Sequence, residues 1–139
     1  RAIENLLYRY AELIDDGDFE GLARLFSEAI IKTPFSDDGF RGYEQALSMY
    51  QNATRLHDSS GTPLTQHVIS NCIIELTDES SATARSRFTV VQATPELPLQ
   101  VIITGRYQDL FSKGNGQWHF RERVMQPQMM GDLSQHLMF

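Results

Sequence analysis

The chain has 139 residues, of which 41% are hydrophobic, and its 12 basic and 18 acidic side chains give a net charge of -6. This length suits one domain over residues 1–139 that buries a core and a modest pocket, and it is too short for two independently folded units. Nucleic acid is not expected as a partner, because phosphate binding needs clustered positive charge and the basic residues here are scattered.

The lone Cys72 excludes an internal disulfide and is expected to be a small apolar residue of the core. No CxxC or HExxH spacing is present, so no metal site is expected. No apolar run approaches the roughly 20 residues that cross a bilayer. We therefore expect no membrane contact and a cytoplasmic protein.

Apolar residues at helical spacing predict a first helix over residues 2–15, which Gly17 is suited to end. Its apolar stripe consists of Ile3, Leu6, Leu7, Tyr10, Leu13 and Ile14. Asp18 can then accept hydrogen bonds from the free amides of a second helix over residues 19–27. These two helices are expected to form a hairpin.

Residues 29–35 resemble a short strand, which Pro34 and the turn-rich residues 36–39 should end. Helical spacing returns with Ala46, Leu47 and Tyr50 and predicts a third helix over residues 43–54.

Four long strands are predicted in series after a loop. They cover residues 65–77, 82–94, 99–112 and 117–126, with short connections rich in turn formers. Neighbouring strands should therefore pair antiparallel as a meander. Helices followed by strands indicate an α+β fold, in which a curved, cone-shaped, mixed or antiparallel sheet packs on the helical hairpin and the third helix around a hollow interior.

Five segments of the chain are informative about its family, and they cover residues 10–19, 40–44, 65–68, 105–107 and 116–120. With the order of elements, these segments resemble the SnoaL-like branch of the nuclear transport factor 2-like superfamily, which includes polyketide cyclases, scytalone dehydratase, hexachlorocyclohexane dehydrochlorinase and, more distantly, ketosteroid isomerase. Together the five segments extend over nearly the whole chain.

The resemblance implies a catalytic pair. Asp15 falls where the dehydratase and the dehydrochlorinase carry their catalytic acid, and His67 falls on the histidine that opens their first long strand. In such a pair the carboxylate orients the imidazole and stabilises its protonated form, so the ring can take a proton from a carbon atom. Elimination or isomerisation would need no cofactor.

The chain also departs from both relatives. The second pocket histidine of the dehydratase aligns with Ser86, and the lysine of the dehydrochlorinase aligns with Tyr10. Tyr107 aligns with a polar pocket residue of the dehydratase, and either tyrosine can donate a hydrogen bond to a developing oxyanion. Ser86, Tyr10 and Tyr107 are therefore expected to contact the substrate.

Without the resemblance, the residues themselves favour a plainer interpretation. On a helical wheel Asp15 lies away from the apolar stripe and should face solvent, although the end of a helix is an unfavourable place for a carboxylate without a partner. Strand alternation places His67 and Asn71 on one face, where Asn71 can line a pocket or bond to backbone. Phe35 is a further expected substrate contact.

The remaining large and charged side chains are assigned to packing and surfaces. Arg121 and Arg123 are expected to form a solvated or oligomer-facing row, and Trp118 to anchor the core or the sheet. The methionines near the C-terminus are expected in the core, with a pocket cap or subunit contact as the alternative. The outer sheet face should pair with another copy as a homodimer or homotrimer, its candidate residues being Val90, Ile102 and Val124.

These features predict a lyase of the dehydratase type or an isomerase that acts on a small hydrophobic cyclic molecule. Two alternatives stay open. One is a noncatalytic module that holds a hydrophobic ligand in the same pocket. The other is an assembly subunit similar to the small subunit of ring-hydroxylating dioxygenases.

Overall fold

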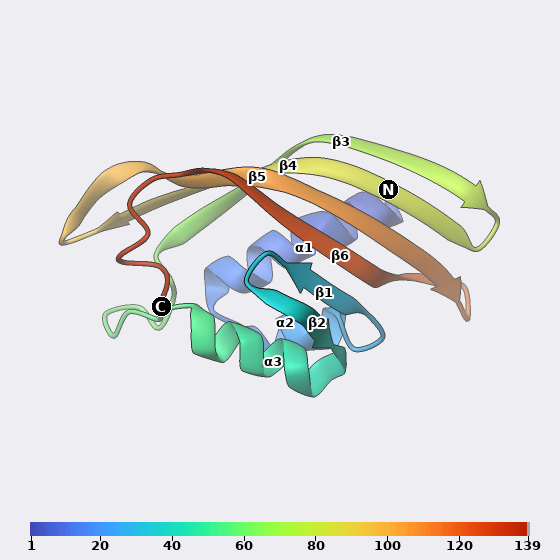
Figure 1. Cartoon of the computed structure of the whole chain (residues 1–139), viewed down its shortest axis with the longest axis horizontal. Coiled ribbons are helices and arrows are strands. Elements are labelled where there is room, and N and C mark those ends of the chain that lie inside the picture. The colour runs from blue at the N-terminus through green and yellow to red at the C-terminus, as the bar shows by residue number, and fades with distance from the viewer. Residues whose placement is uncertain (139) are drawn as a thin grey trace.

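The computed structural model describes residues 1–138, which form three helices and one six-stranded sheet (Figure 1). The helices are α1 (Ala2–Asp16), α2 (Phe19–Leu25) and α3 (Gly42–Ala53). The strands are β1 (Ile30–Thr33), β2 (Ser36–Arg41), β3 (Thr65–Asp78), β4 (Ser81–Thr94), β5 (Leu97–Gly114) and β6 (Gln117–Met130). The predicted α+β class is confirmed.

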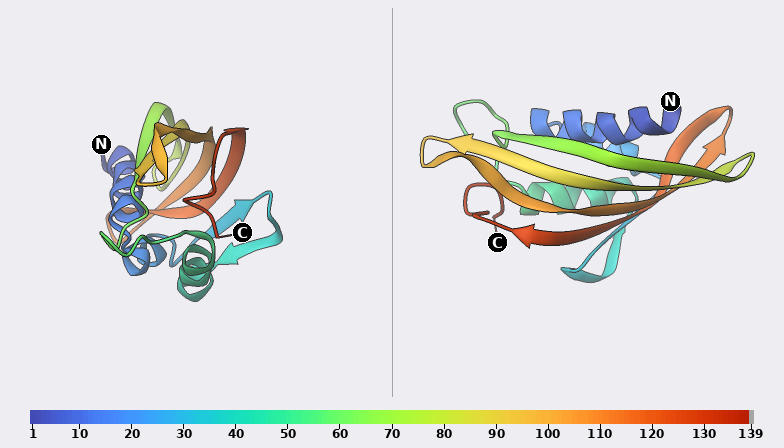
Figure 2. Two further views of the ribbon diagram at one scale, coloured as in Figure 1. Left: turned by 90° about the vertical axis from the view of Figure 1, so that its left-hand side faces the viewer. Right: turned by 90° about the horizontal axis from the view of Figure 1, so that it is seen from above.

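The sheet has the strand order β2-β1-β6-β5-β4-β3 and is not closed. Strands β3 to β6 pair antiparallel as a meander, whereas β1 pairs parallel with β6 and antiparallel with β2, so the sheet is mixed. The long strands arch over the helices, which lie beneath the concave side of the sheet (Figures 1 and 2). Side chains of the sheet and of the helices line a cavity between them.

The helical hairpin forms as its sequence predicts. Helix α1 buries Ile3, Leu7, Tyr10 and Ile14 along one stripe and ends at Gly17, which has a φ of 74°. A side chain here would be strained, and its Cβ would lie 2.6 Å from the carbonyl oxygen of Gly61. Asp18 then begins α2, because its Oδ1 accepts a hydrogen bond of 2.9 Å from the amide of Gly21.

The turn predicted at residues 36–39 is wrong. The chain turns at Pro34 and Phe35, and the following residues form β2, which pairs with β1 through Thr33 and Ser36. Proline cannot donate to a strand ladder, so pairing stops there and resumes after the turn. Because β2 is an edge strand, its acidic residues can stay exposed.

The assignment of Val90 and Ile102 to the outer face of the sheet is also wrong. Val90 and Ile102 are buried, whereas Val124 is half-buried. A bulge shifts the register of β4 and β5 between Val90 and Val91 and so interrupts the alternation from which the outer face was predicted.

Arg123 contradicts the expected solvated row most clearly. Arg121 is exposed, but Arg123 is 0% exposed and forms an ion pair with Asp109 on β5. Its Nε donates to one carboxylate oxygen at 2.8 Å and its Nη2 donates to the other at 3.0 Å. The charge of Arg123 was therefore a poor guide to its exposure, because Asp109 on the neighbouring strand supplies the opposite charge and accepts two of its hydrogen bonds.

Cys72 and Trp118 are half-buried and pack against the core, in keeping with their predicted roles. Met129, Met130 and Met138 are exposed rather than buried in the core.

Within residues 1–138, no helix combines the length and the apolar character needed to span a membrane.

Candidate active site

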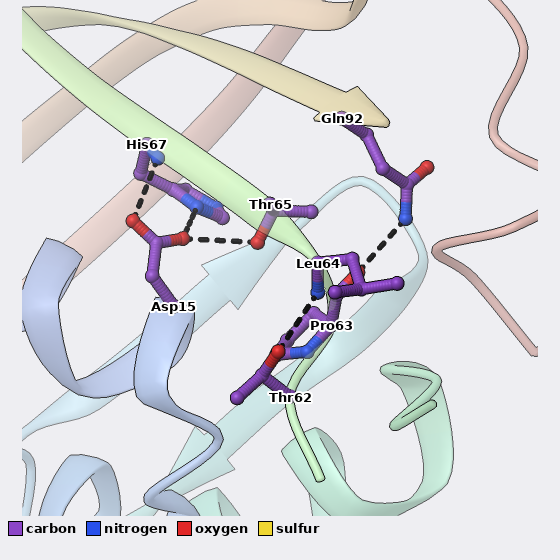
Figure 3. A network of polar contacts seen from close by, with 7 residues as sticks. All are labelled: Asp15, Thr62, Pro63, Leu64, Thr65, His67 and Gln92. Carbon is purple, nitrogen blue, oxygen red and sulfur yellow. Dashed lines mark hydrogen bonds and ion pairs between the residues drawn. The ribbon is translucent and has the colours of Figure 1, made fainter. Parts of the chain in front are cut away.

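Asp15 and His67 meet where the end of α1 lies against the start of β3 (Figure 3). The Oδ1 of Asp15 lies 2.7 Å from Nδ1 of His67 and accepts a hydrogen bond of 2.9 Å from the Thr65 hydroxyl. The other carboxylate oxygen accepts the backbone amide of His67 at 2.8 Å. The carboxylate therefore fixes both the ring and the backbone that carries it.

This arrangement determines which ring nitrogen can react. An ionised carboxylate only accepts hydrogen bonds, so Nδ1 of the neutral His67 ring carries the proton and Nε2 carries the lone pair. The side chain of His67 is 5% exposed and that of Asp15 is 20% exposed. The expectation that Asp15 faces solvent is wrong, because β3 covers this side of the last turn of α1.

A cavity of about 600 Å³ lies beside His67, which forms part of its wall. Aromatic side chains from five elements contribute to the wall, namely Tyr10, Phe40, Tyr50, Phe88 and Tyr107. Asp15 supports His67 from outside the wall. The cavity is large enough for a small cyclic molecule and is bordered mainly by apolar groups.

Three tyrosines line the cavity close to one another. The ring of Tyr10 lies edge-on to the rings of Tyr107, at 5.7 Å between centroids, and of His67, at 6.2 Å. Tyr50 on α3 lies 6.5 Å from Tyr10. Burial raises the pKa of Tyr50 and of Tyr107 well above the usual value, so both hydroxyls keep their protons and can act as donors.

The structure places both predicted tyrosines, Tyr10 and Tyr107, in the cavity wall. Sequence reasoning assigned Tyr50 only to helical spacing and missed that it also lines the cavity. Its hydroxyl is buried, and its ring lies next to that of Tyr10. The spacing of α3 could have indicated this position, because Tyr50 lies one turn after the buried Ala46 and so on the same inward face of the helix.

Arg123 lies directly behind two of these tyrosines. Its guanidinium carbon is 3.7 Å from the ring centroid of Tyr107 and 4.4 Å from that of Tyr10. Burial alone would lower the pKa of the guanidinium, but the facing carboxylate of Asp109 raises it above its usual value. The arginine therefore carries a permanent charge and holds the tyrosine rings by cation–π contact.

Sequence reasoning also missed His136, which follows β6 and lines the cavity. Its ring centroid lies 6.1 Å from that of His67. Burial, and to a smaller extent the nearby His67, lowers the pKa of His136 to about 4, so its imidazole is neutral at pH 7. The cavity thus contains two imidazoles, although no second histidine was predicted there.

Of the other three predicted substrate contacts, one lines the cavity and two do not. Phe35 is largely exposed and lines the cavity, whereas Asn71 and Ser86 do not contribute to its wall. Asn71 has a φ of 53° in an irregular part of β3, where the register shifts between Ser70 and Ile73. This bulge ends the alternation that would have placed Asn71 beside His67 on the inner face, and Asn71 is exposed.

Ser86 is buried in β4 opposite Tyr107 of β5. It does not form part of the cavity wall, and its hydroxyl has no partner among residues 1–138. In the same part of the chain, no group of three or more histidine, cysteine or acidic side chains is arranged to hold a metal ion.

Residues 1–124 match the SnoaL-like domain family. A search of curated proteins finds no match.

Several solved structures share the fold. A protein from Novosphingobium aromaticivorans, described as a candidate scytalone dehydratase, is 28% identical with a TM-score of 0.74, and the match covers 95% of this chain and 85% of that one. A cystatin-like protein of unknown function from Nostoc punctiforme is 22% identical with a TM-score of 0.77, covering 95% and 92% of the two chains.

The β subunit of a candidate aromatic-ring-hydroxylating dioxygenase from Novosphingobium aromaticivorans is 14% identical with a TM-score of 0.72, covering 93% of this chain and 88% of the subunit. The structures below 25% identity establish the fold alone. The match over residues 1–124 and the shared cystatin-like, nuclear transport factor 2-like architecture show that the chain belongs to the SnoaL-like family.

Proposed function

We propose that this protein is a cofactor-independent lyase of the dehydratase type or an isomerase, acting on a small hydrophobic cyclic molecule. The observation that carries the proposal is the contact between Asp15 and His67 at the cavity wall. The carboxylate occupies one ring nitrogen and the backbone amide of the same residue, which leaves Nε2 for the contents of the cavity. Such an arrangement suits a general base.

In the proposed reaction, Nε2 of His67 takes a proton from a carbon atom next to a carbonyl group. Asp15 stabilises the imidazolium that forms. In an elimination, the C–H electron pair becomes the new double bond, and the leaving hydroxide departs with its bonding pair and accepts the proton as water. In an isomerisation, the proton returns to a different carbon atom.

The tyrosines supply the second requirement of this chemistry, which is stabilisation of negative charge on the substrate oxygen. Tyr10 and Tyr107 line the same cavity as His67, and the Tyr107 hydroxyl keeps its proton. A fixed hydroxyl donor in an apolar cavity stabilises a developing oxyanion more strongly than water does. The relative described as a candidate scytalone dehydratase further supports dehydration.

Hydrogen exchange at carbon tests the proposal and does not require the natural substrate. A panel of cyclic ketones, including 1-tetralone and 2-tetralone, would be incubated with the protein in D2O and analysed by mass spectrometry. We expect the wild type to catalyse deuterium incorporation next to the carbonyl of at least one ketone. Replacing His67 by Gln should reduce the rate by about 10² to 10⁴-fold, the usual contribution of general base catalysis.

The matched control is His119→Gln, since His119 is a partly exposed histidine paired with Glu28 outside the cavity wall. This variant should exchange protons as the wild type does. Exchange that persists in His67→Gln would contradict the mechanism. Binding of the ketones without any exchange would favour the noncatalytic binding module instead.

We also propose that the protein forms a homodimer or homotrimer through the outer face of its sheet. This face is rich in exposed apolar side chains, including Val68, Leu99, Val101 and Leu110. Exposed apolar surface of this kind commonly marks an interface. Light scattering coupled to size-exclusion chromatography would measure the mass directly, and a monomer at micromolar concentration would contradict the proposal.

A further inference from the structure

The segment after β6 forms part of the cavity wall although it lies outside the family match, which ends at residue 124. From the end of β6 this tail returns toward the C-terminal end of α3 (Figures 1 and 2). Its side chains that line the cavity are Leu133, His136 and Leu137. The tail therefore adds a histidine that the matched part of the family does not supply.

Backbone hydrogen bonds hold this tail in a defined position. The amide of Arg55 donates to the carbonyl oxygen of His136 at 2.7 Å, and the amide of Met138 donates to that of Ala53 at 2.9 Å. The amide of His136 donates to the carbonyl oxygen of Leu133 at 3.1 Å. The backbone on both sides of His136 is thus fixed to the end of α3 and to the tail itself.

Side chains also clamp the residue before His136. The carbonyl oxygen of Gln135 accepts hydrogen bonds from the buried Gln92 at 3.1 Å and lies 2.9 Å from Nε2 of His57. Gln92 donates in addition to the carbonyl oxygen of Pro63 at 2.9 Å. The backbone at Gln135 and His136 is therefore hydrogen-bonded to three other parts of the chain, namely Arg55, His57 and Gln92.

Within this frame the His136 ring has an unmet polar requirement. Its Nδ1 is fully enclosed and has no hydrogen-bond partner among the described residues. Its Nε2 has no hydrogen bond within residues 1–138 either, but this atom is not fully enclosed, and the residue lines the cavity. Because buried polar groups are nearly always satisfied, a molecule in the cavity is the natural source of a partner for Nε2.

His136 and His67 are not equivalent. His67 is bonded to Asp15, which suits it to accept a proton. His136 has no hydrogen bond to a carboxylate among the described residues, and its pKa is lowered to about 4 by burial and by His67. It therefore stays neutral near pH 7 and can form a hydrogen bond without taking a proton from the substrate.

We propose that His136 is a ligand-binding residue whose imidazole forms a hydrogen bond with an oxygen atom of the bound molecule and so orients that molecule toward His67. The inference rests on the proposed function only in its premise that the cavity holds a small cyclic molecule. It assigns a binding role to the C-terminal tail, independently of any turnover.

Two probes of matched shape test this role. The affinities of 2-naphthol and naphthalene would be measured by titration against the wild type, His136→Phe and His119→Phe. Phenylalanine keeps a ring of similar size but cannot form the hydrogen bond. We expect the wild type and His119→Phe to prefer 2-naphthol, and His136→Phe to lose about tenfold of that preference, the size of one ordinary hydrogen bond.

Equal losses for the two probes in His136→Phe would show a packing role and overturn the assignment, as would failure of the wild type to bind either probe. Tyr50→Phe provides a further control. If the hydroxyl preference disappears in that variant and persists in His136→Phe, the oxygen is recognised by Tyr50 instead.

A measurement on the wild type avoids any dependence on variants that fail to fold. The ¹⁵N resonances of the His136 ring should shift when 2-naphthol is added and change little with naphthalene. Unchanged resonances at saturating 2-naphthol would overturn the proposal. Hydroxyl preference without catalysed exchange of the ketones would leave His136 as a binding residue and refute the enzyme, so the two proposals can fail separately.

Discussion

Two aspartates in this molecule hold a basic side chain at nearly the same distance and yet are suited to different tasks. Asp15 lies 2.7 Å from the ring of His67, and Asp109 lies 2.8 Å from the guanidinium of Arg123. The first pair is partly exposed and borders the cavity, whereas the second is fully buried behind its wall. The contrast shows that the partner and its surroundings, rather than the ion-pair distance, determine what a carboxylate can do.

The chemical difference lies in the proton. Arginine is effectively always protonated, so the Asp109 and Arg123 pair cannot exchange a proton with a substrate and serves to hold Tyr10 and Tyr107 in place. Histidine can gain and lose a proton near neutral pH. Of these two pairs, only that of Asp15 and His67 is therefore suited to acid–base chemistry.

The largest expected effect is the loss of one partner from the buried pair. Asp109→Leu leaves the charge of Arg123 without compensation, and we expect the free energy of unfolding to fall by about 3–5 kcal/mol. Urea denaturation measures this change. Adding Arg123→Met to the same protein removes the orphaned charge and should restore much of the stability, whereas a double variant as unstable as Asp109→Leu would contradict this account.

A somewhat smaller effect should appear in the dependence of stability on pH. The pKa of His136 falls from an ordinary 6.5 to about 4 in the folded protein through burial and the nearby His67, with a smaller opposing effect of Asp15 and a further lowering by His57. The unfolded chain therefore binds a proton at this site more readily than the folded one. Stability is present above about pH 6.5 and is lost as the pH falls toward 4, by about 3 kcal/mol in total.

Comparison with His136→Phe isolates this contribution, because other groups that titrate in the same range are shared by both proteins. The difference in unfolding free energy between the wild type and His136→Phe should change across this pH window in the direction that favours the variant at low pH. A constant difference would show that His136 is not buried in its neutral form.

Replacing the first aspartate should separate function from stability. In Asp15→Asn the side-chain shape is kept, but only one of the two accepting oxygens remains, so one donor loses its partner and we expect a loss of stability of about 1–2 kcal/mol. The charge that stabilises the protonated His67 is removed, and catalysed deuterium exchange should fall by about 10²-fold. If Asp15→Asn exchanged deuterium at the normal rate, Asp15 would have no role in proton transfer, and its proposed difference from Asp109 would be wrong.

The buried pair could not be predicted from the sequence, because a bulge changes the pairing of β5 with β6. Near the turn Phe111 pairs with Phe120, but after the register shift Asp109 pairs with Arg123. Without that shift Asp109 would face Glu122, and an acid opposite an acid gives no reason to expect an ion pair. Alternation within β6 alone does not reveal the extra residue.

The elements around the candidate site were easier to predict than its contacts. Apolar periodicity located α1 and β3, whereas the contact of Asp15 with His67 followed only from the family resemblance. A helical wheel describes an isolated helix and contains no information about the strand that crosses its last turn. His136 was missed because the tail has no periodic pattern from which its return to the cavity could be inferred.

A third aspartate gives the smallest expected effect and a reference for the other two. Asp18 pairs with no basic side chain in the described structure and accepts only the amide of Gly21, at 2.9 Å, as the N-cap of α2. Asp18→Ala should lower the free energy of unfolding by about 1 kcal/mol, the usual value of an N-cap, and should leave ketone exchange unchanged. Parallel urea denaturation and exchange measurements would check both parts. If Asp18→Ala reduced exchange as strongly as Asp15→Asn, loosening of the helical hairpin rather than loss of the carboxylate beside His67 would explain both variants.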